Sequence, residues 1–216
     1  MHIEKLTLGP FLVNTYIVYL EEAGDAVVID PGANAEAILS ALGERKLSVS
    51  HIFNTHGHSD HIAANAALKS AFPRAKIRIH GRDAHMLTDA RANLSTAFGF
   101  EVVSPPAEAY FEGNTSVAAA GIDFRVEHVP GHSPGSVCLI PEAETPLVFT
   151  GDTLFAGSIG RTDFPGGNAG ALVAGIKEKI LTLPDDTVVY PGHGDITTVL
   201  AEREGNYYVS EPSSAP

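Results

Sequence analysis

Residues 55–61 of the chain read Thr-His-Gly-His-Ser-Asp-His, and this stretch places three imidazoles and one carboxylate within six positions. The packing of a protein core does not require so many metal-binding groups in one place. Because side chains alternate along an extended segment, we expect His56 and His58 to point the same way. Asp60 and His61 stand where the next helix is expected to begin, so they can reach a second centre beside the first. Imidazole and carboxylate suit zinc and also iron or manganese, so the stretch predicts a metal site.

Three later segments share one pattern, in which an apolar strand is followed by a glycine and then by a residue that can bind a metal. They are residues 124–129 before Gly131-His132, 147–150 before Gly151-Asp152, and 187–190 before Gly192-His193. Loops at strand ends can gather at one edge of a sheet, and glycine allows the backbone to approach a site closely. A lone histidine or aspartate in such a loop is more often structural, but the three together favour one site that includes residues 56–61.

The periodicity of apolar residues divides the chain into two halves, each of which combines strands with helices. In the first half we expect strands at 2–8, 14–20, 26–30, 49–54 and 76–80, and helices at 34–45, 60–71 and 82–89. In the second half we expect strands at 116–119, 122–129, 136–140, 147–150 and 187–190, and helices at 168–181 and 197–204. For residues 90–113 the sequence predicts no regular secondary structure. This α/β pattern indicates two β-sheets packed together with helices outside.

Composition limits the classes of protein to which the chain can belong. A length of 216 residues, of which 44% are hydrophobic, suits a single domain, expected at 1–208 and followed by a flexible tail at 209–216. The net charge of −12 disfavours a nucleic-acid partner, because phosphate contacts need clustered Lys and Arg. A single cysteine, Cys138, excludes an intramolecular disulfide and a CxxC site. We find no apolar run of about 20 residues and no leader sequence, so we expect a cytoplasmic protein without a membrane partner.

The spacing of residues 56–61 resembles the HxHxDH signature of the metallo-β-lactamase superfamily, and His132, Asp152 and His193 follow in the order that this signature requires. The resemblance extends from residue 2 to about residue 207. It implies a four-layer αβ/βα sandwich of two mixed β-sheets with helices outside, and a binuclear metal centre at the sandwich edge. The implied ligands are His56, His58 and His132 for the first ion, Asp60, His61 and His193 for the second, and Asp152 as the bridge.

Within this superfamily the chain is most similar to glyoxalase II (hydroxyacylglutathione hydrolase) and its short relatives. The similarity lies in residues 55–58, 151–155, 157–167 and 191–194. It implies a small-molecule thioester such as S-lactoylglutathione as the substrate, cleaved by metal-bound hydroxide. It also implies two divalent metal ions, with zinc expected first and iron or manganese as alternatives. Asp60 would then be a catalytic residue that orients the hydroxide. The leaving thiolate, whose parent thiol has a pKa of about 8.5, needs no general acid.

Two features depart from full-length glyoxalase II. That enzyme continues into a helical segment that binds glutathione, whereas only 23 residues follow His193 in this chain of 216. We therefore expect no dedicated glutathione-binding segment here. Residues Ile62-Ala63-Ala64 also replace the usual pair of glycines after the signature. This replacement is expected to alter helix packing rather than the metal site.

Two other functions stay open at the level of sequence. A persulfide dioxygenase shares the fold and the Gly-Arg-Thr-Asp-Phe stretch at 160–164, but it uses a single iron at the positions of His56, His132 and Asp152. The Pro-Gly-His-Gly at 191–194 is more similar to the hydrolases. In the second alternative, the sandwich keeps its ligands only for stability. An antibiotic-hydrolysing role is disfavoured, because true β-lactamases of this fold usually lack the bridging aspartate and are exported.

Three further residues are candidates for supporting the ligands from behind. Asp30 ends a strand and can turn toward the site, although a turn-forming role fits it equally well. Arg161 and Asp163 can pair with each other and brace their loop, which we favour, or they can hydrogen-bond a ligand histidine. Cys138 lies in an apolar strand and is expected to be buried. The role of residues 90–113 and the oligomeric state stay open.

Overall fold

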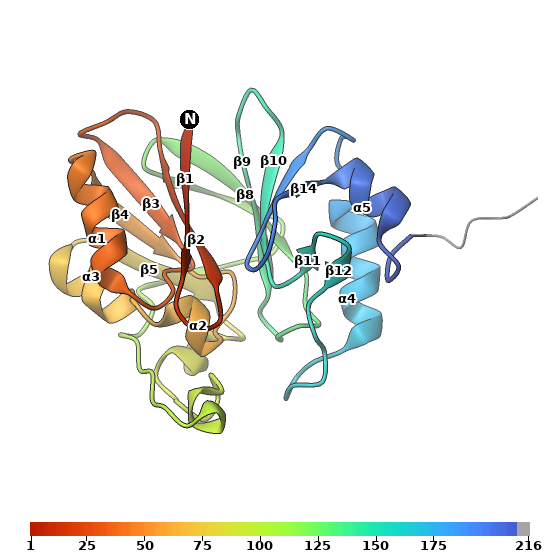
Figure 1. Cartoon of the computed structure of the whole chain (residues 1–216), viewed down its shortest axis with the longest axis horizontal. Coiled ribbons are helices and arrows are strands. Elements are labelled where there is room, and N and C mark those ends of the chain that lie inside the picture. The colour runs from red at the N-terminus through yellow and green to blue at the C-terminus, as the bar shows by residue number, and fades with distance from the viewer. Residues whose placement is uncertain (211–216) are drawn as a thin grey trace, which may run out of the picture.

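The computed structural model describes residues 1–210, and the part of the expected tail at 211–216 lies outside the described residues. Two six-stranded β-sheets face each other, and helices cover the outer face of each sheet (Figure 1). The prediction of a four-layer sandwich with two mixed sheets is therefore confirmed.

The first sheet has the strand order β1-β2-β3-β4-β5-β6. Its strands are β1 (His2–Leu8), β2 (Val13–Tyr19), β3 (Asp25–Ile29), β4 (Ser48–Phe53), β5 (Lys76–His80) and β6 (Ala109–Phe111). The first three strands pair antiparallel, whereas β3 to β6 run parallel. Outside this sheet lie α1 (Ala35–Glu44), α2 (Ser59–Ile62) and α3 (Asn65–Ala71).

The second sheet has the strand order β14-β13-β10-β9-β8-β7. Its strands are β7 (Thr115–Ala119), β8 (Ile122–His128), β9 (Val137–Pro141), β10 (Leu147–Gly151), β13 (Val188–Pro191) and β14 (Thr197–Thr198). Only β10 and β13 pair in parallel, and the other pairs are antiparallel. A small hairpin of β11 (Leu154–Phe155) and β12 (Ser158–Ile159) follows β10. The outer face carries α4 (Ala169–Gly175), which continues as a π-helical turn at Ile176–Ile180, and α5 (Val199–Gly205).

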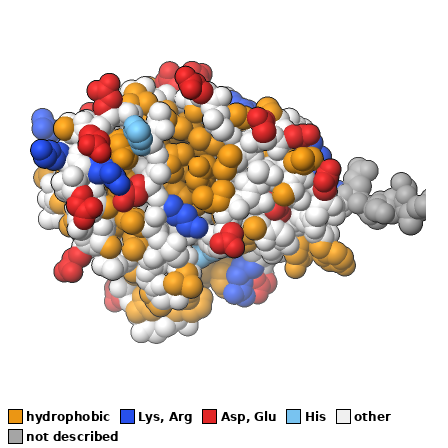
Figure 2. Space-filling model, turned by 45° about the horizontal axis from the view of Figure 1, so that its top comes forward, with side chains coloured by type: hydrophobic (Ala, Val, Ile, Leu, Met, Phe, Trp, Pro, Cys, Tyr) orange, Lys and Arg blue, Asp and Glu red, His pale blue; other side chains and the backbone are white. Residues whose placement is uncertain are grey.

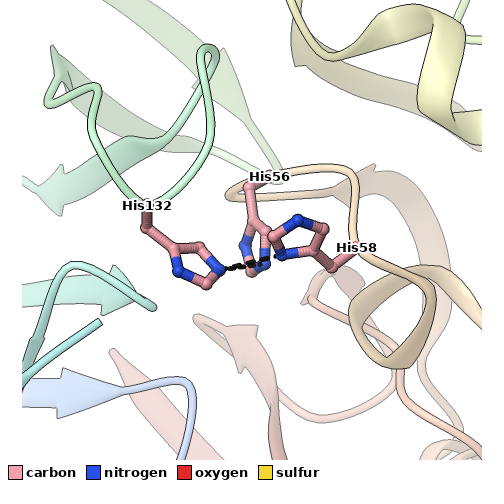
Figure 3. Close-up of side chains that lie close together, drawn as sticks. All are labelled: His56, His58 and His132. Atoms are coloured by element: carbon pink, nitrogen blue, oxygen red, sulfur yellow. Dashed lines mark hydrogen bonds between the residues drawn. The ribbon is translucent and has the colours of Figure 1, made fainter. Parts of the chain in front are cut away.

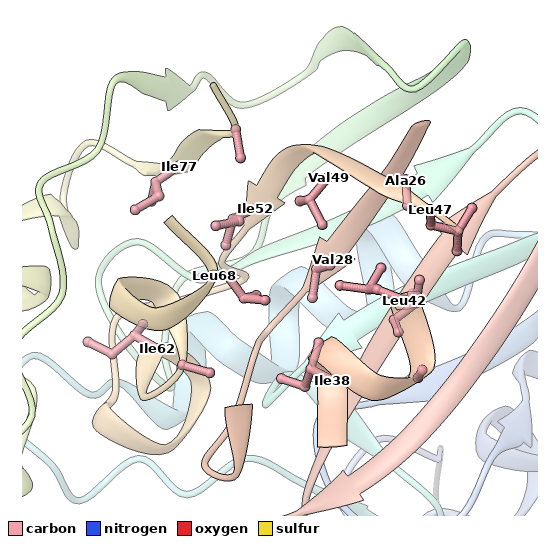
Figure 4. Packing of buried hydrophobic residues seen from close by; sticks show 14 of the residues in the cluster. Ala26, Val28, Ile38, Leu42, Leu47, Val49, Ile52, Ile62, Leu68 and Ile77 are labelled. Atoms are coloured by element: carbon pink, nitrogen blue, oxygen red, sulfur yellow. The ribbon is translucent and has the colours of Figure 1, made fainter. Parts of the chain in front are cut away.

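The alternation of side chains along the strands explains how one sequence fills three hydrophobic layers. In β2, Tyr16 and Val18 point into the space between the sheets, whereas Ile17 and Tyr19 point toward the helices of the first half. Large aromatic side chains, among them Phe53 and Phe124, fill the layer between the sheets. Figure 4 shows the layer between the first sheet and its helices, where aliphatic side chains of strands and helices pack together.

Four expected elements differ from the structure. The helix expected at 60–71 is interrupted, because the Ala64 N–H donates to Pro31 O rather than to a carbonyl of its own helix. The helix expected at 82–89 is only a 3₁₀ turn at Ala84–Leu87. The helix expected at 197–204 starts at Val199, because residues 197–198 pair with β13 and Thr198 caps the helix. Residues 90–113, expected to lack regular structure, contain a 3₁₀ turn at Ser95–Phe98 and the short strand β6.

The two ends of the sandwich differ in chemistry. The loops that follow β4, β8, β10 and β13 meet at the end drawn at the bottom of Figure 1. Hydrophobic side chains gather in a hollow at the opposite end, which comes forward in Figure 2. A pocket of about 610 Å³ there is lined by residues such as Ile3, Leu147 and Tyr190, and it includes none of the side chains predicted as ligands. Among residues 1–210, no helix combines the length and hydropathy needed to cross a membrane.

Candidate metal centre

The structure brings all seven predicted ligand side chains together at the bottom end of the sandwich. The loop after β4 and the start of α2 supply four of them, and the loops after β8, β10 and β13 supply one each. They form two groups of three, with one aspartate between the groups. The histidine group is His56, His58 and His132; the mixed group is Asp60, His61 and His193; the residue between them is Asp152.

The ring nitrogens of the histidine group face one another (Figure 3). His132 Nε2 lies 2.8 Å from His58 Nδ1 and 3.3 Å from His56 Nε2. All three side chains are buried. Burial and the neighbouring imidazoles lower the pKa of His58 to about 3, and the same causes hold the pKa of His56 well below its ordinary value. His56 and His58 therefore disfavour protons.

The Nδ1 atoms of His132 and His56 point away from the group and make hydrogen bonds, and these bonds fix which ring nitrogens carry lone pairs. Arg161 O lies 2.8 Å from His132 Nδ1 and can only accept, so His132 Nδ1–H donates and its Nε2 carries a lone pair. Thr55 Oγ1 donates to Asp30 Oδ2 at 2.7 Å, so it accepts from His56 Nδ1, 3.1 Å away. The Nε2 atoms of His56 and His132 are thus two acceptors that face each other. A cation satisfies both of them.

The mixed group combines imidazole with carboxylate. His193 Nε2 lies 3.3 Å from Asp60 Oδ2 and 3.3 Å from His61 Nε2. Burial lowers the pKa of His61, but the carboxylates of Asp152, Asp60 and Asp30 outweigh it and raise the pKa well above its ordinary value. The pKa of His193 is raised in the same way, with burial opposed by Asp60 and Asp152. This group attracts positive charge.

Asp152 lies between the two groups. Its Oδ1 is 3.3 Å from His61 Nε2, and its Oδ2 is 3.5 Å from His132 Nε2 and 3.6 Å from His193 Nε2. Burial raises the pKa of Asp152, but the charges of His61 and His132 bring it well below the ordinary value. Oδ1 is buried and accepts no hydrogen bond from the described residues, and an unsatisfied buried carboxylate oxygen is strongly unfavourable. The donor set therefore fits divalent cations, which satisfy this oxygen and the facing imidazoles together.

The backbone around the centre is shaped for this close approach. A Cβ atom on Gly192 would overlap Asp152 Oδ1 and would lie 2.8 Å from His61 Cε1. Any side chain at position 192 therefore displaces two of the metal-binding groups. This explains the glycine that precedes His193 in the sequence pattern.

Asp30 supports the centre from behind. Its carboxylate accepts hydrogen bonds from the Thr55 N–H at 2.7 Å and from Thr55 Oγ1 at 2.7 Å, and it lies 3.0 Å from His61 Nδ1. The residue adopts a left-handed φ of 48°, which aspartate tolerates better than most residues. Asp30 thus orients His61 directly and His56 through Thr55, which is the geometry that the supporting role requires.

The side chains of Arg161 and Asp163 pair with each other and do not hydrogen-bond a ligand histidine. The guanidinium donates from Nε and Nη2 to the two Asp163 oxygens at 2.7 and 2.6 Å, and it lies 4.0 Å from the centre of the Phe164 ring. Arg161 contacts His132 only through its main-chain carbonyl. The favoured interpretation, a brace within the loop, therefore describes the side chains, whereas the contact with the ligand comes from the backbone.

Asp83 is a buried residue of the site that the sequence analysis did not identify. Its carboxylate accepts hydrogen bonds from the Gly57 N–H at 3.1 Å, the Gly135 N–H at 2.6 Å and Ser133 Oγ at 2.6 Å. It thereby ties the loop of His56 and His58 to the loop of His132. Burial raises the pKa of this carboxyl above its ordinary value. Strand β5 is followed by Gly81 and, after Arg82, by Asp83, which is one residue off the strand–glycine–ligand pattern of the later segments, so the sequence contained a weak signal.

The loop of His193 is held from the first sheet, which gave no sequence signal. The Asn14 N–H donates to Gly192 O at 2.7 Å, and its side-chain amide donates to Pro191 O and Gly194 O. The Tyr16 hydroxyl donates to Pro191 O at 2.6 Å. These contacts join the two halves of the sandwich next to the centre.

A pocket of about 400 Å³ opens onto the centre. Side chains of both ligand groups line it, and so does Asp152. Its other walls are largely apolar and include Phe11, Leu94, Phe98, Phe155, Ile159 and Phe164. Residues 90–113, whose role the sequence left open, contribute Asn93, Leu94 and Phe98. Arg161 is the only Lys or Arg among the described residues that line the pocket.

The two ligand groups are expected to lose a cation over different ranges of pH. A protonated imidazole cannot bind a metal, so affinity falls as the pH drops through the pKa of the ligand. Because the pKa of His61 and His193 is raised and that of His56 and His58 is lowered, the mixed group should lose affinity at the higher pH. Calorimetric titration with Zn²⁺ from about pH 8 to 5 measures this. One pH profile shared by all bound ions would contradict it.

Comparisons with known proteins find relatives that cover nearly the whole chain. The family model of the metallo-beta-lactamase superfamily matches residues 8–193. The chain is 33% identical to the hydroxyacylglutathione hydrolase GloC of Haemophilus influenzae over 217 residues, which cover 99% of this chain and 100% of that protein. Among solved structures, the BLEG-1 B3 metallo-beta-lactamase superposes with a TM-score of 0.92 at 36% identity, covering 97% of this chain and 100% of that chain. A di-iron-bound form of TTHA1623 has a TM-score of 0.83 at 37% identity, covering 95% and 99% of the two chains.

Proposed function

The chain belongs to the metallo-beta-lactamase superfamily, and from this premise we propose that it is a binuclear metal-dependent hydrolase that cleaves thioesters such as S-lactoylglutathione. One observation carries the proposal: two complete groups of three ligands meet at Asp152, whose buried Oδ1 lacks a hydrogen-bond partner among the described residues. A single ion would leave one of these groups without a cation. The similarity to a hydroxyacylglutathione hydrolase supports the choice of a thioester.

Each group in the site has a task that follows from its position. Two divalent cations, when bound, lower the pKa of water toward about 7 and polarise a carbonyl oxygen. The Asp60 carboxylate is 20% exposed at the pocket, and its pKa is lowered because His61 and His193 outweigh the effect of burial. It therefore stays ionised and can orient an attacking water molecule. The apolar walls keep bulk water away from the reacting carbonyl.

The residues that line the pocket favour a thioester over an ester or an amide, because the three substrates differ in how easily their leaving groups depart. The described residues that line the pocket include no lysine, cysteine or tyrosine that could serve as a separate general acid. A thiolate, whose thiol has a pKa of about 8.5, leaves without being protonated, whereas an amine or an alkoxide does not. The site as built therefore matches thioester chemistry.

A β-lactam is the second class of substrate to test. The close superposition with a chain described as a B3 metallo-beta-lactamase favours it. Asp152, which the resemblance assigns as a bridge and which true β-lactamases of this fold usually lack, disfavours it. A dioxygenase with one iron is disfavoured because the mixed group would then have no role.

Metal analysis and a substrate panel test the proposed function. Elemental analysis of the purified protein should give two divalent ions per chain, with zinc expected first and iron or manganese as alternatives. The metal-loaded protein should hydrolyse S-lactoylglutathione to lactate and glutathione without consuming oxygen. Oxygen uptake with a glutathione persulfide would support the dioxygenase. Faster cleavage of a β-lactam than of any thioester would overturn the proposal. Bound metal without turnover of any of these substrates would mean that the metal site only stabilises the fold.

Selectivity for the thiol half of the substrate is expected to be weak. Remote binding energy confers selectivity. Among the described residues that line the pocket, Arg161 is the only Lys or Arg that an anionic thiol can meet, and its guanidinium is already paired with Asp163. The kcat/KM values for lactoyl thioesters of glutathione and of N-acetylcysteamine should therefore lie within about tenfold, which corresponds to ~1.4 kcal/mol. Steady-state kinetics measures the ratio. A thousandfold preference for glutathione would reveal a recognition surface elsewhere.

A further inference from the structure

A second, smaller chamber lies beside the pocket of the metal centre. It has a volume of about 200 Å³ and shares Phe11, Ser59 and Asp60 with the larger pocket. Its walls come from four segments of the sequence: the turn after β1, Ala33 just before α1, the segment around α2, and residues 100–102. The turn after β1 and α2 lie at the bottom of the sandwich in Figure 1.

The chamber is apolar apart from the edge that it shares with the metal centre. The side chains that form its wall are Leu8, Phe11, Ala33, Ala63, Phe100 and Val102. Asp60 is the only ionisable residue among the described residues that line it, and its carboxylate faces His193 at 3.3 Å. The chamber therefore suits an uncharged hydrocarbon group, and the described residues that line it offer no cationic side chain to a carboxylate or a phosphate.

Phe11 borders both spaces. Its ring packs edge-to-face on Phe98, which lines the larger pocket, with 5.1 Å between ring centroids. It also contacts Phe100, which lines the chamber, at 6.1 Å, so the three rings form one cluster where the two spaces meet. Because both spaces reach Asp60, a thioester whose carbonyl lies at the metal centre can place one arm in each of them.

We infer that the chamber binds the acyl group of the substrate, so that the enzyme prefers thioesters with an apolar acyl chain. The inference rests on the proposed hydrolase function. The larger pocket also contains the polar residues Asn93, Ser158 and Arg161, which suit the polar thiol arm, and the smaller chamber then receives the acyl arm. An apolar cavity of ~150 Å³ holds a benzene molecule, so this chamber has room for a chain of about six carbons. A lactoyl group is short and polar, so it would leave most of the chamber unfilled.

The preference can be measured with acyl thioesters of N-acetylcysteamine. Burial of four added methylenes, at roughly fourfold each, sets an upper limit of about 250-fold for hexanoyl over acetyl. We expect a ratio of kcat/KM of at least tenfold in the metal-loaded protein. Non-hydrolysable ketones, in which a methylene replaces the sulfur, should show the same preference in their dissociation constants by calorimetry.

Ala63→Leu tests the assignment because it fills the chamber from the wall. It should reduce the hexanoyl/acetyl ratio to about threefold or less, in both kinetics and ketone binding. Ala66→Leu is the matched control: it makes the same chemical change at an exposed position of α3 and should keep the wild-type ratio. Phe100→Ala removes wall from the other side and should also lower the ratio. The ratio is used because a partial folding defect lowers both rates equally.

The outcomes separate this inference from the proposed function. Thioester hydrolysis with a ratio below threefold, or an Ala63→Leu variant that keeps the wild-type ratio, overturns the acyl chamber and leaves the hydrolase standing. A hexanoyl preference in ketone binding that Ala63→Leu abolishes, with no hydrolysis of any thioester, supports the chamber and overturns the hydrolase.

Discussion

Asp152→Ala is expected to lower kcat/KM for thioester hydrolysis by at least about 10³-fold, the upper range for losing one preorganised electrostatic group. It is also expected to remove at least one metal ion per chain. Asp152 lies within 3.6 Å of His61 and His193 in the mixed group and of His132 in the histidine group, so its loss affects both groups. The variant would also remove one of the carboxylates that raise the pKa of His61 and His193.

Two comparisons make this result specific. Asp152→Asn keeps the size of the side chain but loses the charge, so it should also lose an ion, although an amide oxygen can retain part of the binding. Asp123→Ala removes an exposed carboxylate from β8, far from the centre, and should keep both metal content and rate. Elemental analysis and steady-state kinetics are the measurements. If Asp152→Ala retained full metal occupancy and full activity, the binuclear assignment would be wrong.

Asp83→Ala should weaken metal binding by the histidine group about 10- to 100-fold, although Asp83 is not one of the predicted ligands. Its carboxylate holds the Gly57 N–H, between His56 and His58, and the loop around His132 in one arrangement. The variant should also lower the free energy of unfolding by about 3 kcal/mol, because buried donors lose their acceptor. Relief of the unfavourable burial that raises the pKa of Asp83 offsets only part of this loss.

Zinc titration and urea unfolding of the metal-free protein test both effects of Asp83. Asp83→Asn should lose less in each, because its amide oxygen can still accept from the Gly135 N–H while its amide nitrogen cannot accept from Gly57. Asp123→Ala, at an exposed position of β8, should change neither quantity by much. Wild-type zinc affinity together with reduced stability would restrict Asp83 to a structural role.

The sequence predicted best what depends on neighbouring residues. The cluster at residues 56–61 and the three strand–glycine–ligand segments together gave seven candidate ligands, and the structure brings their side chains together. Alternation of apolar residues predicted most of the strands, because the period of two is a local property of extended backbone. Cys138, expected to be buried by its strand neighbours, is buried. The errors in the helices arose where a distant group intervened, as when Pro31 O took the hydrogen bond of Ala64 and ended a helix.

Residue types and their spacing thus determined the fold, the family and the chemistry of the donor set, because strand periodicity and a short ligand motif require only local sequence. The tertiary structure decided which groups orient those donors. Asp30 reaches Thr55 across 25 positions, and Asp83 reaches Gly135 across 52. It also decided the shape of the substrate space, since Phe11, Ala63 and Phe100 meet only when the turn after β1 packs against α2 and the loop at residue 100. Such contacts depend on how the two sheets and their loops pack together, and a local sequence pattern carries no information about that packing.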